Sequence, residues 1–176
     1  MGYSARVGAD YQRGNIVVGV VGEFGKNEIS DSVSAFSTTP AFYTMTRDLK
    51  WEASARGRLG YAANTTLFYG TFGAGYARIN RDFYSSNTAN AYAQSGKKNQ
   101  FGITGGGGIE QKLGRNFSVG LEYQYHQYQD NDYRVRAAGG PAGGPFTRGN
   151  ASGTDFRRDS QDFRWHSLRA TAAFRF

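Results

Sequence analysis

The C-terminal stretch of this chain, residues 165–176, alternates between apolar and polar side chains with a period of two. From Ser167 onward one face of the implied strand carries only Leu, Ala and Phe, whereas the opposite face carries Arg169 and Arg175. Successive side chains of a β-strand point to opposite faces of its sheet. This strand therefore separates an apolar environment from a polar one, and the fold must supply both.

The composition excludes membrane-spanning helices but leaves membrane-spanning strands open. Mean hydropathy is −0.60, and no run approaches the roughly 20 apolar residues that a membrane helix needs. A membrane β-strand shows apolar side chains to lipid only at every second position, so it does not raise the hydropathy. Aromatic residues make up 15% of the chain and 25 residues are glycine, which suits strands joined by tight turns.

Six further segments have strand-like composition, and most of them alternate clearly. One segment is ambiguous, because apolar side chains occur on both of its faces: Leu67 and Ile79 lie on one, and Phe68 lies on the other together with Arg78. We assign the Arg78 face as polar, and note that a β-bulge would switch the faces midway. The predicted strands cover residues 3–12, 15–24, 49–62, 65–79, 99–112, 116–128 and 165–176.

The connections between these strands alternate strictly in length. Short turns follow the first, third and fifth strands, whereas the other three connections are long: residues 25–48, 80–98 and 129–163. A soluble sandwich has no reason to sort its connections in this way. Membrane barrels do, because they have short turns on the periplasmic side and long extracellular loops. The pattern predicts an all-β, up-and-down antiparallel transmembrane barrel, formed by residues 1–176 as a single domain.

The polar faces of the predicted strands carry charge almost throughout, and a membrane barrel places this face in its lumen. A soluble barrel would instead have to fit the many large aromatic side chains of the other face inside its narrow interior. The predicted lumen charges are Arg6, Asp10, Glu23, Lys50, Glu52, Arg56, Arg58, Arg78, Glu110, Glu122, Arg169 and Arg175. The aromatic residues predicted to lie at the two membrane interfaces are Tyr11, Trp51, Tyr61, Phe101, Phe117, Tyr125, Phe174 and Phe176.

Seven strands is an odd number, whereas bacterial single-chain barrels have an even number. If the last strand ends at the periplasmic side, the first predicted strand begins at the extracellular side. We therefore expect a signal peptide and an eighth, N-terminal strand upstream of Met1. The alternative is that the first and last strands pair directly as parallel neighbours.

Several segments resemble the strands of small alphaproteobacterial outer-membrane barrels, the OmpA-like "outer membrane protein beta-barrel domain" group. These are residues 51–61, 67–71, 75–77, 121–125 and 174–176. The resemblance implies an eight-stranded barrel in the bacterial outer membrane, surface-exposed loops, and a structural or porin-like role. In such barrels the closing strand with its terminal Phe, here Phe174 and Phe176, is read by the barrel-assembly machinery.

The sequence leaves open what such a barrel does. An eight-stranded barrel is just wide enough to be filled by its own side chains, so opposite charges are expected to pair into a plug that closes the lumen. The alternative is a narrow porin-like channel for small solutes with a slight preference for anions, because the predicted lumen holds seven basic and five acidic residues.

A third interpretation is an enzyme that modifies lipid A. It would need a nucleophile with a base in reach, and the chain offers only His126 and His166, with His126 and Ser167 placed to meet across neighbouring strands. We predict no enzyme, no cofactor and no metal. The chain has no cysteine for a thiolate metal site.

The expected partners are outer-membrane lipids, lipopolysaccharide and the assembly machinery. The net charge of +7 is scattered along the chain, so nucleic acid is not expected. Several loop residues are candidates to contact lipopolysaccharide phosphates or a surface ligand that the sequence does not identify: Phe36, Phe42, Tyr43, Tyr84, Tyr92, Arg157 and Arg158.

Overall fold

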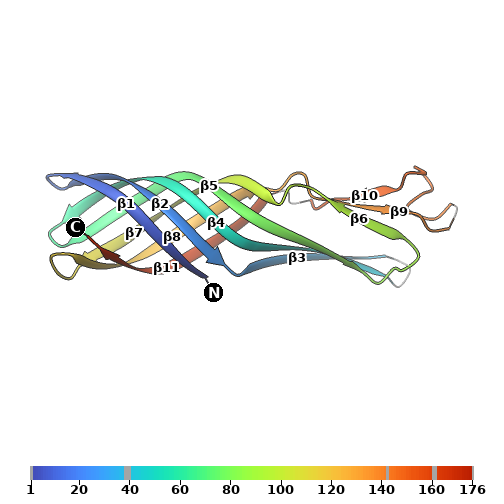
Figure 1. The fold of residues 1–176 in the computed structure, drawn as a ribbon, viewed down its shortest axis with the longest axis horizontal. Coiled ribbons are helices and arrows are strands. Elements are labelled where there is room, and N and C mark those ends of the chain that lie inside the picture. The colour runs from blue at the N-terminus through green and yellow to red at the C-terminus, as the bar shows by residue number, and fades with distance from the viewer. Residues whose placement is uncertain (1, 38–40, 142, 160–161, 176) are drawn as a thin grey trace.

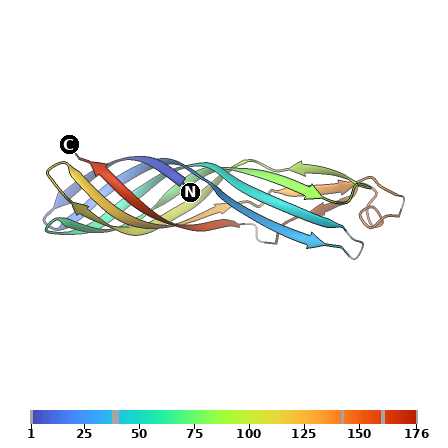
Figure 2. The ribbon, with the colours of Figure 1, turned by 90° about the horizontal axis from the view of Figure 1, so that it is seen from below.

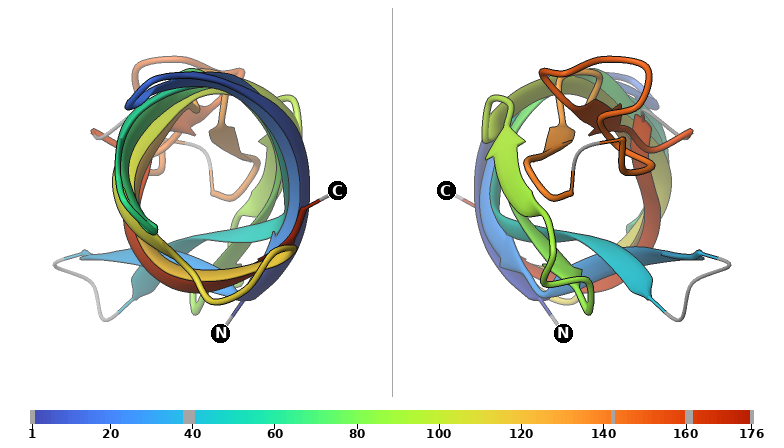
Figure 3. Two further views of the ribbon diagram at one scale, coloured as in Figure 1. Left: turned by 90° about the vertical axis from the view of Figure 1, so that its left-hand side faces the viewer. Right: turned by 90° about the vertical axis from the view of Figure 1, so that its right-hand side faces the viewer.

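A computed structural model describes residues 2–37, 41–141, 143–159 and 162–175. Seven antiparallel strands follow one another in a single curled sheet, in the order β1 (Gly2–Arg13), β2 (Ile16–Asn27), β4 (Phe42–Ala63), β5 (Thr66–Ser85), β7 (Asn99–Lys112), β8 (Phe117–Gln129) and β11 (Asp162–Phe174). Viewed along its long axis, the sheet curls into a ring (Figure 3). These observations confirm the predicted all-β barrel. No helix in the described part of the chain is long and apolar enough to cross a membrane.

Short turns gather at one end of the barrel together with the C-terminus (Figure 1). Two of them require a positive φ, which Gly14 (φ 61°) and Asn64 (φ 55°) provide. Such residues favour two-residue hairpin turns, whose twist matches that of the flanking strands. The turns therefore set the strict up-and-down order of the sheet.

The opposite end of the barrel carries a long extension (Figure 1). Here β3 (Ile29–Phe36) pairs with the first half of β4, and β6 (Ala91–Ser95), β9 (Arg134–Ala138) and β10 (Thr154–Phe156) form a separate antiparallel sheet. Strands β4 and β5 have 22 and 20 residues, about twice the 9–11 residues that cross a membrane. Their outer halves therefore stand in water.

The three connections predicted as long loops thus contain regular structure. The sequence hides these strands because β6, β9 and β10 have only 5, 5 and 3 residues, and β3 is rich in serine. Serine and threonine side chains bond across the β3–β4 hairpin, as Ser32 does with Thr46 at 2.9 Å and Ser34 with Thr44 at 2.8 Å. Strands this short, or this rich in small polar residues, have too few apolar positions to show a hydrophobic period.

The two edges of the curled sheet are β1 and β11, which run side by side near the N-terminus (Figure 2). Among the described residues no backbone ladder joins them, so the parallel pairing considered from the sequence is not formed. A cleft of about 480 Å³ lies between these edges; it is lined by Gly2, Tyr3, Ser4, Asn27, Glu28, Ile29 and residues 167–170.

Candidate functional site: the charged lumen

Glu122 on β8 is the centre of an ion-pair network inside the barrel. Its carboxylate, 1% exposed, accepts hydrogen bonds from Arg6 Nη1 at 2.6 Å, Arg56 Nη1 at 3.0 Å and the Tyr69 hydroxyl at 2.7 Å. Gln124 also donates to it. Because a buried charge is costly unless it is paired and hydrogen-bonded, the four donors account for an ionised carboxylate at this depth.

Arginines extend the network in both directions along the lumen. Arg56 Nη2 also donates to Glu23 at 2.5 Å, and Glu23 in turn accepts from Arg169. Towards the turns, Arg58 bridges Asp10 at 3.0 Å and Glu110 at 2.5 Å. Each of these two arginines therefore joins carboxylates from different strands, which ties the barrel wall together across its interior.

Two further groups complete the turn end of the network. Arg175 Nη2 donates to Glu110 at 2.6 Å, and Ser118 donates to the same carboxylate. The Arg58 guanidinium lies 3.9 Å from the centre of the Tyr69 ring. The lumen-facing Gly108 makes room for that ring, because a Cβ there would lie 2.6 Å from the Tyr69 hydroxyl.

Two of the twelve predicted lumen charges lie outside, so this part of the prediction is wrong. A β-bulge between Leu49 and Trp51 inserts Lys50 as an extra residue, which leaves Lys50 exposed and turns Leu49 inward. On β5 the lumen face is the one with Ala77 and Ile79, both 0% exposed, so Arg78 points outward. Without Lys50 and Arg78 the lumen holds five basic and five acidic residues of the predicted set, and its charge is balanced.

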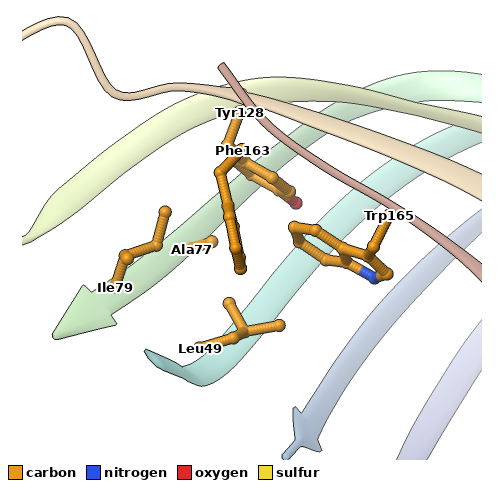
Figure 4. Close-up of a cluster of buried hydrophobic side chains, with 6 residues drawn as sticks. All are labelled: Leu49, Ala77, Ile79, Tyr128, Phe163 and Trp165. Atoms are coloured by element: carbon orange, nitrogen blue, oxygen red, sulfur yellow. The ribbon is translucent and has the colours of Figure 1, made fainter. Parts of the chain in front are cut away.

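The loop end of the lumen is filled by an apolar cluster instead of charges (Figure 4). It consists of Leu49, Ala77, Ile79, Tyr128, Phe163 and Trp165, each at most 7% exposed. Gly75 makes room for the ring of Tyr128, because a Cβ there would lie 2.1 Å from the Tyr128 hydroxyl. The sequence did not predict this cluster because its members come from four strands and one of them, Leu49, depends on the bulge.

Glu52 does not pair with an arginine, unlike the other lumen carboxylates. Its Oε1 lies 2.7 Å from His126 Nδ1 and accepts a hydrogen bond from the Tyr128 hydroxyl at 2.7 Å. The other imidazole nitrogen, His126 Nε2, lies 3.2 Å from the Ser167 hydroxyl oxygen. The contact of His126 with Ser167 considered from the sequence is therefore present. His126 also contacts the carboxylate of Glu52, which the sequence had not associated with this pair.

An aromatic belt runs around the outside of the barrel near its loop end. Neighbouring rings of Phe24, Trp51, Tyr76 and Phe101 have centroids 5.9, 5.7 and 4.7 Å apart across β2, β4, β5 and β7. Aromatic side chains favour the membrane–water interface. The sequence predicted Trp51 and Phe101 at an interface, but the ambiguous face of β5 concealed Tyr76.

The remaining predicted interface residues divide between the two ends of the barrel. Near the turns Tyr11, Tyr61, Phe117 and Phe174 are 72%, 52%, 44% and 71% exposed on the outer face. Tyr125 is half-buried and packs 5.2 Å from the His166 ring. Phe176 lies outside the described residues.

The extension beyond the barrel is packed around its own apolar cluster. Met45, Tyr133 and Val135 are buried, and Phe83, Tyr92 and Phe156 pack against them. At its base the buried carboxylate of Asp130 accepts from Arg47 at 3.2 Å and from Arg81. Within the described residues no group of three or more His, Cys, Asp and Glu side chains could hold a metal ion.

The loop residues singled out in the sequence have different surroundings in the extension. Tyr43 and Tyr92 contribute to the interior, whereas Phe36, Phe42 and Tyr84 form an exposed aromatic strip with centroids 6.4 and 5.4 Å apart. Arg158 donates to Asp31 at 2.6 Å, and Arg157 remains exposed.

Comparison with known proteins agrees with this architecture. Residues 1–176 match the family described as "Outer membrane protein beta-barrel domain". The chain is 32% identical over 142 residues to the "22 kDa outer membrane protein" of Rhizobium leguminosarum bv. viciae, covering 81% of this chain and 56% of that protein.

Two relatives from Brucella melitensis biotype 1 are also similar. They are its "31 kDa outer-membrane immunogenic protein", 30% identical over 68% of this chain and 50% of that protein, and its "25 kDa outer-membrane immunogenic protein", 28% identical over 91% and 61%. This chain thus spans between half and three fifths of the length of these relatives. No solved structure matches it.

The curled antiparallel sheet, the charged interior and the match along all 176 residues lead to one conclusion: this chain belongs to the outer membrane protein beta-barrel family and is a protein of the bacterial outer membrane.

Proposed function

We propose that this protein is a structural barrel whose lumen is closed by its own side chains and whose extension forms a surface for external contacts. The observation that carries this proposal is the charge-balanced network around Glu122, Arg56 and Arg58, capped by the apolar cluster at the loop end. A barrel of this width has little interior space beyond its side chains, and here they bond to one another.

The alternative function is a narrow channel for small solutes, and the net positive charge predicted for the lumen no longer supports it. A preference for anions followed from an excess of basic residues in the lumen, and that excess disappears when Lys50 and Arg78 point outward.

Conductance in planar lipid bilayers tests the proposal directly. We expect the folded protein to give no channel events, because the ion pairs and the apolar cluster block the path. As a matched pair, Trp165→Ala combined with Phe163→Ala removes bulk from the cluster, whereas Phe36→Ala removes an exposed ring far from the lumen. Regular, voltage-stable openings of the unmodified protein would show that it is a channel.

The surface role is proposed from the extension. Its exposed strip of Phe36, Phe42 and Tyr84 offers apolar contact area, and the Brucella relatives carry the word "immunogenic" in their names. We propose outer-membrane lipids, lipopolysaccharide and the barrel-assembly machinery as partners. Antibodies raised against the folded protein are expected to lose binding when residues of the strip are changed to serine.

A further inference from the structure

Three lumen-facing side chains lie in a row that the structural role does not require. Ser167 Oγ is 3.2 Å from His126 Nε2, and His126 Nδ1 is 2.7 Å from Glu52 Oε1. A hydroxyl, an imidazole and a carboxylate in this order form the constellation that activates a serine nucleophile. We propose that Ser167 is the nucleophile of an ester-hydrolysing site in the barrel wall, with His126 as its base, Glu52 as the residue that positions His126, and lipid acyl esters as substrates.

The imidazole is held rigidly, as a general base must be. The His126 ring stacks on Trp165 with centroids 4.7 Å apart and planes 7° apart, and it is 1% exposed. Trp165 lies directly opposite His126 in the β8–β11 ladder, so Ser167 is its diagonal neighbour on the same face. Diagonal neighbours in a sheet are within reach of a long or aromatic side chain.

Glu52 orients this ring from across the lumen. With the imidazole proton on Nδ1, His126 donates to Glu52 and leaves Nε2 free to accept the Ser167 hydroxyl proton. The Tyr128 hydroxyl donates to the same oxygen of Glu52 at 2.7 Å, and Tyr128 is fully buried. Glu52 is thereby held as a carboxylate in the position that stabilises an imidazolium, which is the role of the acid in a serine triad.

Ser167 is open to a substrate, unlike the buried ion pairs. It lines the cleft of about 480 Å³ between the edges β1 and β11. The outer wall of the cleft includes Leu168 and Tyr3, which are 69% and 76% exposed on the face that meets lipid. A lipid chain lying against the barrel can therefore reach the hydroxyl from the side, without passing along the lumen.

The height of the cleft suits the ester bonds of a lipid. Ser4, Gly25 and Glu52 are register partners in neighbouring strands, and Trp51 of the outer aromatic belt is adjacent to Glu52, so the belt passes close to the cleft. Aromatic belts mark the boundary between acyl chains and headgroups, and lipid acyl esters lie at this boundary. The long loops are extracellular in such barrels, so the substrate is a lipid of the outer leaflet.

Donors for the developing oxyanion are also present at the cleft. Arg175 N donates to Asn116 O of the neighbouring chain segment, and the β8–β11 register has no shift. Amide groups alternate between the two sides of an antiparallel strand, so the N–H of Leu168 points away from β8 and towards the cleft. Arg169, which also lines the cleft and donates to Glu23 through Nη1, adds a positive charge there.

The reaction is a two-step hydrolysis that uses water as the co-reactant. Ser167 Oγ bonds to the ester carbonyl carbon while its proton passes to His126 Nε2. The tetrahedral intermediate collapses, the ester C–O bond breaks, and the leaving alcohol takes the proton from His126. Water then attacks the acyl-Ser167 carbonyl carbon and its proton passes to His126 Nε2. The bond between the acyl carbon and Ser167 Oγ breaks, Ser167 Oγ takes the proton back from His126, and the carboxylic acid is released.

A fluorophosphonate probe and p-nitrophenyl laurate test this proposal on the folded, detergent-solubilised chain. We expect one phosphonyl adduct per molecule, located at Ser167 by peptide mass analysis, and hydrolysis of the laurate ester. Ser167→Ala should abolish both, and Glu52→Gln should lower the hydrolysis rate roughly 100-fold or more, as loss of the orienting acid does in serine triads.

Ser54→Ala is the matched control, because Ser54 is a lumen-side serine two residues from Glu52 on β4. It should keep both labelling and hydrolysis. Ser167→Ala removes the nucleophile by deleting a single oxygen atom, and His126→Gln independently removes the base. If only one of these variants folds, that variant alone still tests the proposal. The proposal is overturned if the folded protein gives no Ser167 adduct, or if Ser167→Ala hydrolyses the ester as fast as the unmodified chain. Neither outcome bears on conductance.

Discussion

Glu122 shows how a single residue can stabilise the barrel from inside. Its carboxylate accepts hydrogen bonds from four side chains on four different strands: Arg6, Arg56, Tyr69 and Gln124. Removing one partner of a buried ion pair leaves the other charges uncompensated, and this costs far more than the net stabilisation of the intact pair.

We therefore predict that Glu122→Gln lowers the free energy of unfolding by about 3–5 kcal/mol. Urea unfolding in detergent or lipid measures this change. Lys50→Gln is the control, because Lys50 is an exposed charge at the bulge and surface changes usually stay within about 0.5 kcal/mol. Equal stability of the two variants would contradict the role assigned to Glu122.

At the scale of elements, the junction between barrel and extension depends on Asp130. This carboxylate, whose side chain is 0% exposed, follows β8 and pairs with Arg47 of β4 and Arg81 of β5. It thereby links the path of the last long connection to the protruding halves of β4 and β5.

We expect Asp130→Asn to loosen the extension while the barrel stays folded, because two buried guanidinium groups lose their shared carboxylate. Limited proteolysis should then cut within residues 143–153 faster than in the unmodified chain. Asp155→Asn, which affects the exposed Arg136–Asp155 pair, should change the cutting rate little, since exposed ion pairs contribute weakly. Similar cutting of both variants would argue against the junction.

The extension contains two carboxyl groups with a lowered pKa, Asp31 and Asp132. Burial acts to raise the pKa of Asp31, but the hydrogen bond from Arg47 and the charge of Arg158 outweigh it and hold the pKa below its ordinary value. Burial likewise acts to raise the pKa of Asp132, which the Lys97 N–H and the Arg81 charge lower overall.

A depressed folded-state pKa stabilises the fold above the unfolded pKa, about 3.9, and this contribution is lost as pH falls through the folded value. We predict unchanged hydrogen-exchange protection factors in β3 and β9 from pH 7 to about 5, with a decline only below about pH 4. Asp31→Asn should remove part of that decline. A fall in protection between pH 7 and 5 would point to other groups.

For the whole molecule, the structure separates one end with short turns from one end with a long extension (Figure 1). Because the chain has no cysteine, single cysteines report this topology without background. In Gram-negative cells that produce the protein, we expect Ser152→Cys in the extension to react with a membrane-impermeant maleimide.

Arg115→Cys, in the turn between β7 and β8, should react only after the outer membrane is permeabilised. Total cysteine reactivity in denatured samples provides the control for the amount of protein. Labelling of Arg115→Cys in intact cells would reverse the proposed orientation.

The sequence by itself determined the barrel, its strand order and most of the lumen charges. Alternation of side chains and loop length are local properties, so both can be read from the sequence without knowing which residues are in contact. Arg56, Arg58 and Glu122 were predictable in this way. It could not place Lys50 or Leu49, because a single inserted residue reverses the faces of a strand and leaves no mark in composition. It could not place Arg78 either, because both faces of β5 carry apolar side chains.

Only the tertiary structure decided which side chains meet across the lumen. The apolar cluster around Trp165, the pairing of Asp130 with Arg47 and Arg81, and the row formed by Glu52, His126 and Ser167 join residues far apart in the chain. Their contacts depend on how tightly the sheet curls and on its register, and neither quantity can be read from alternation alone.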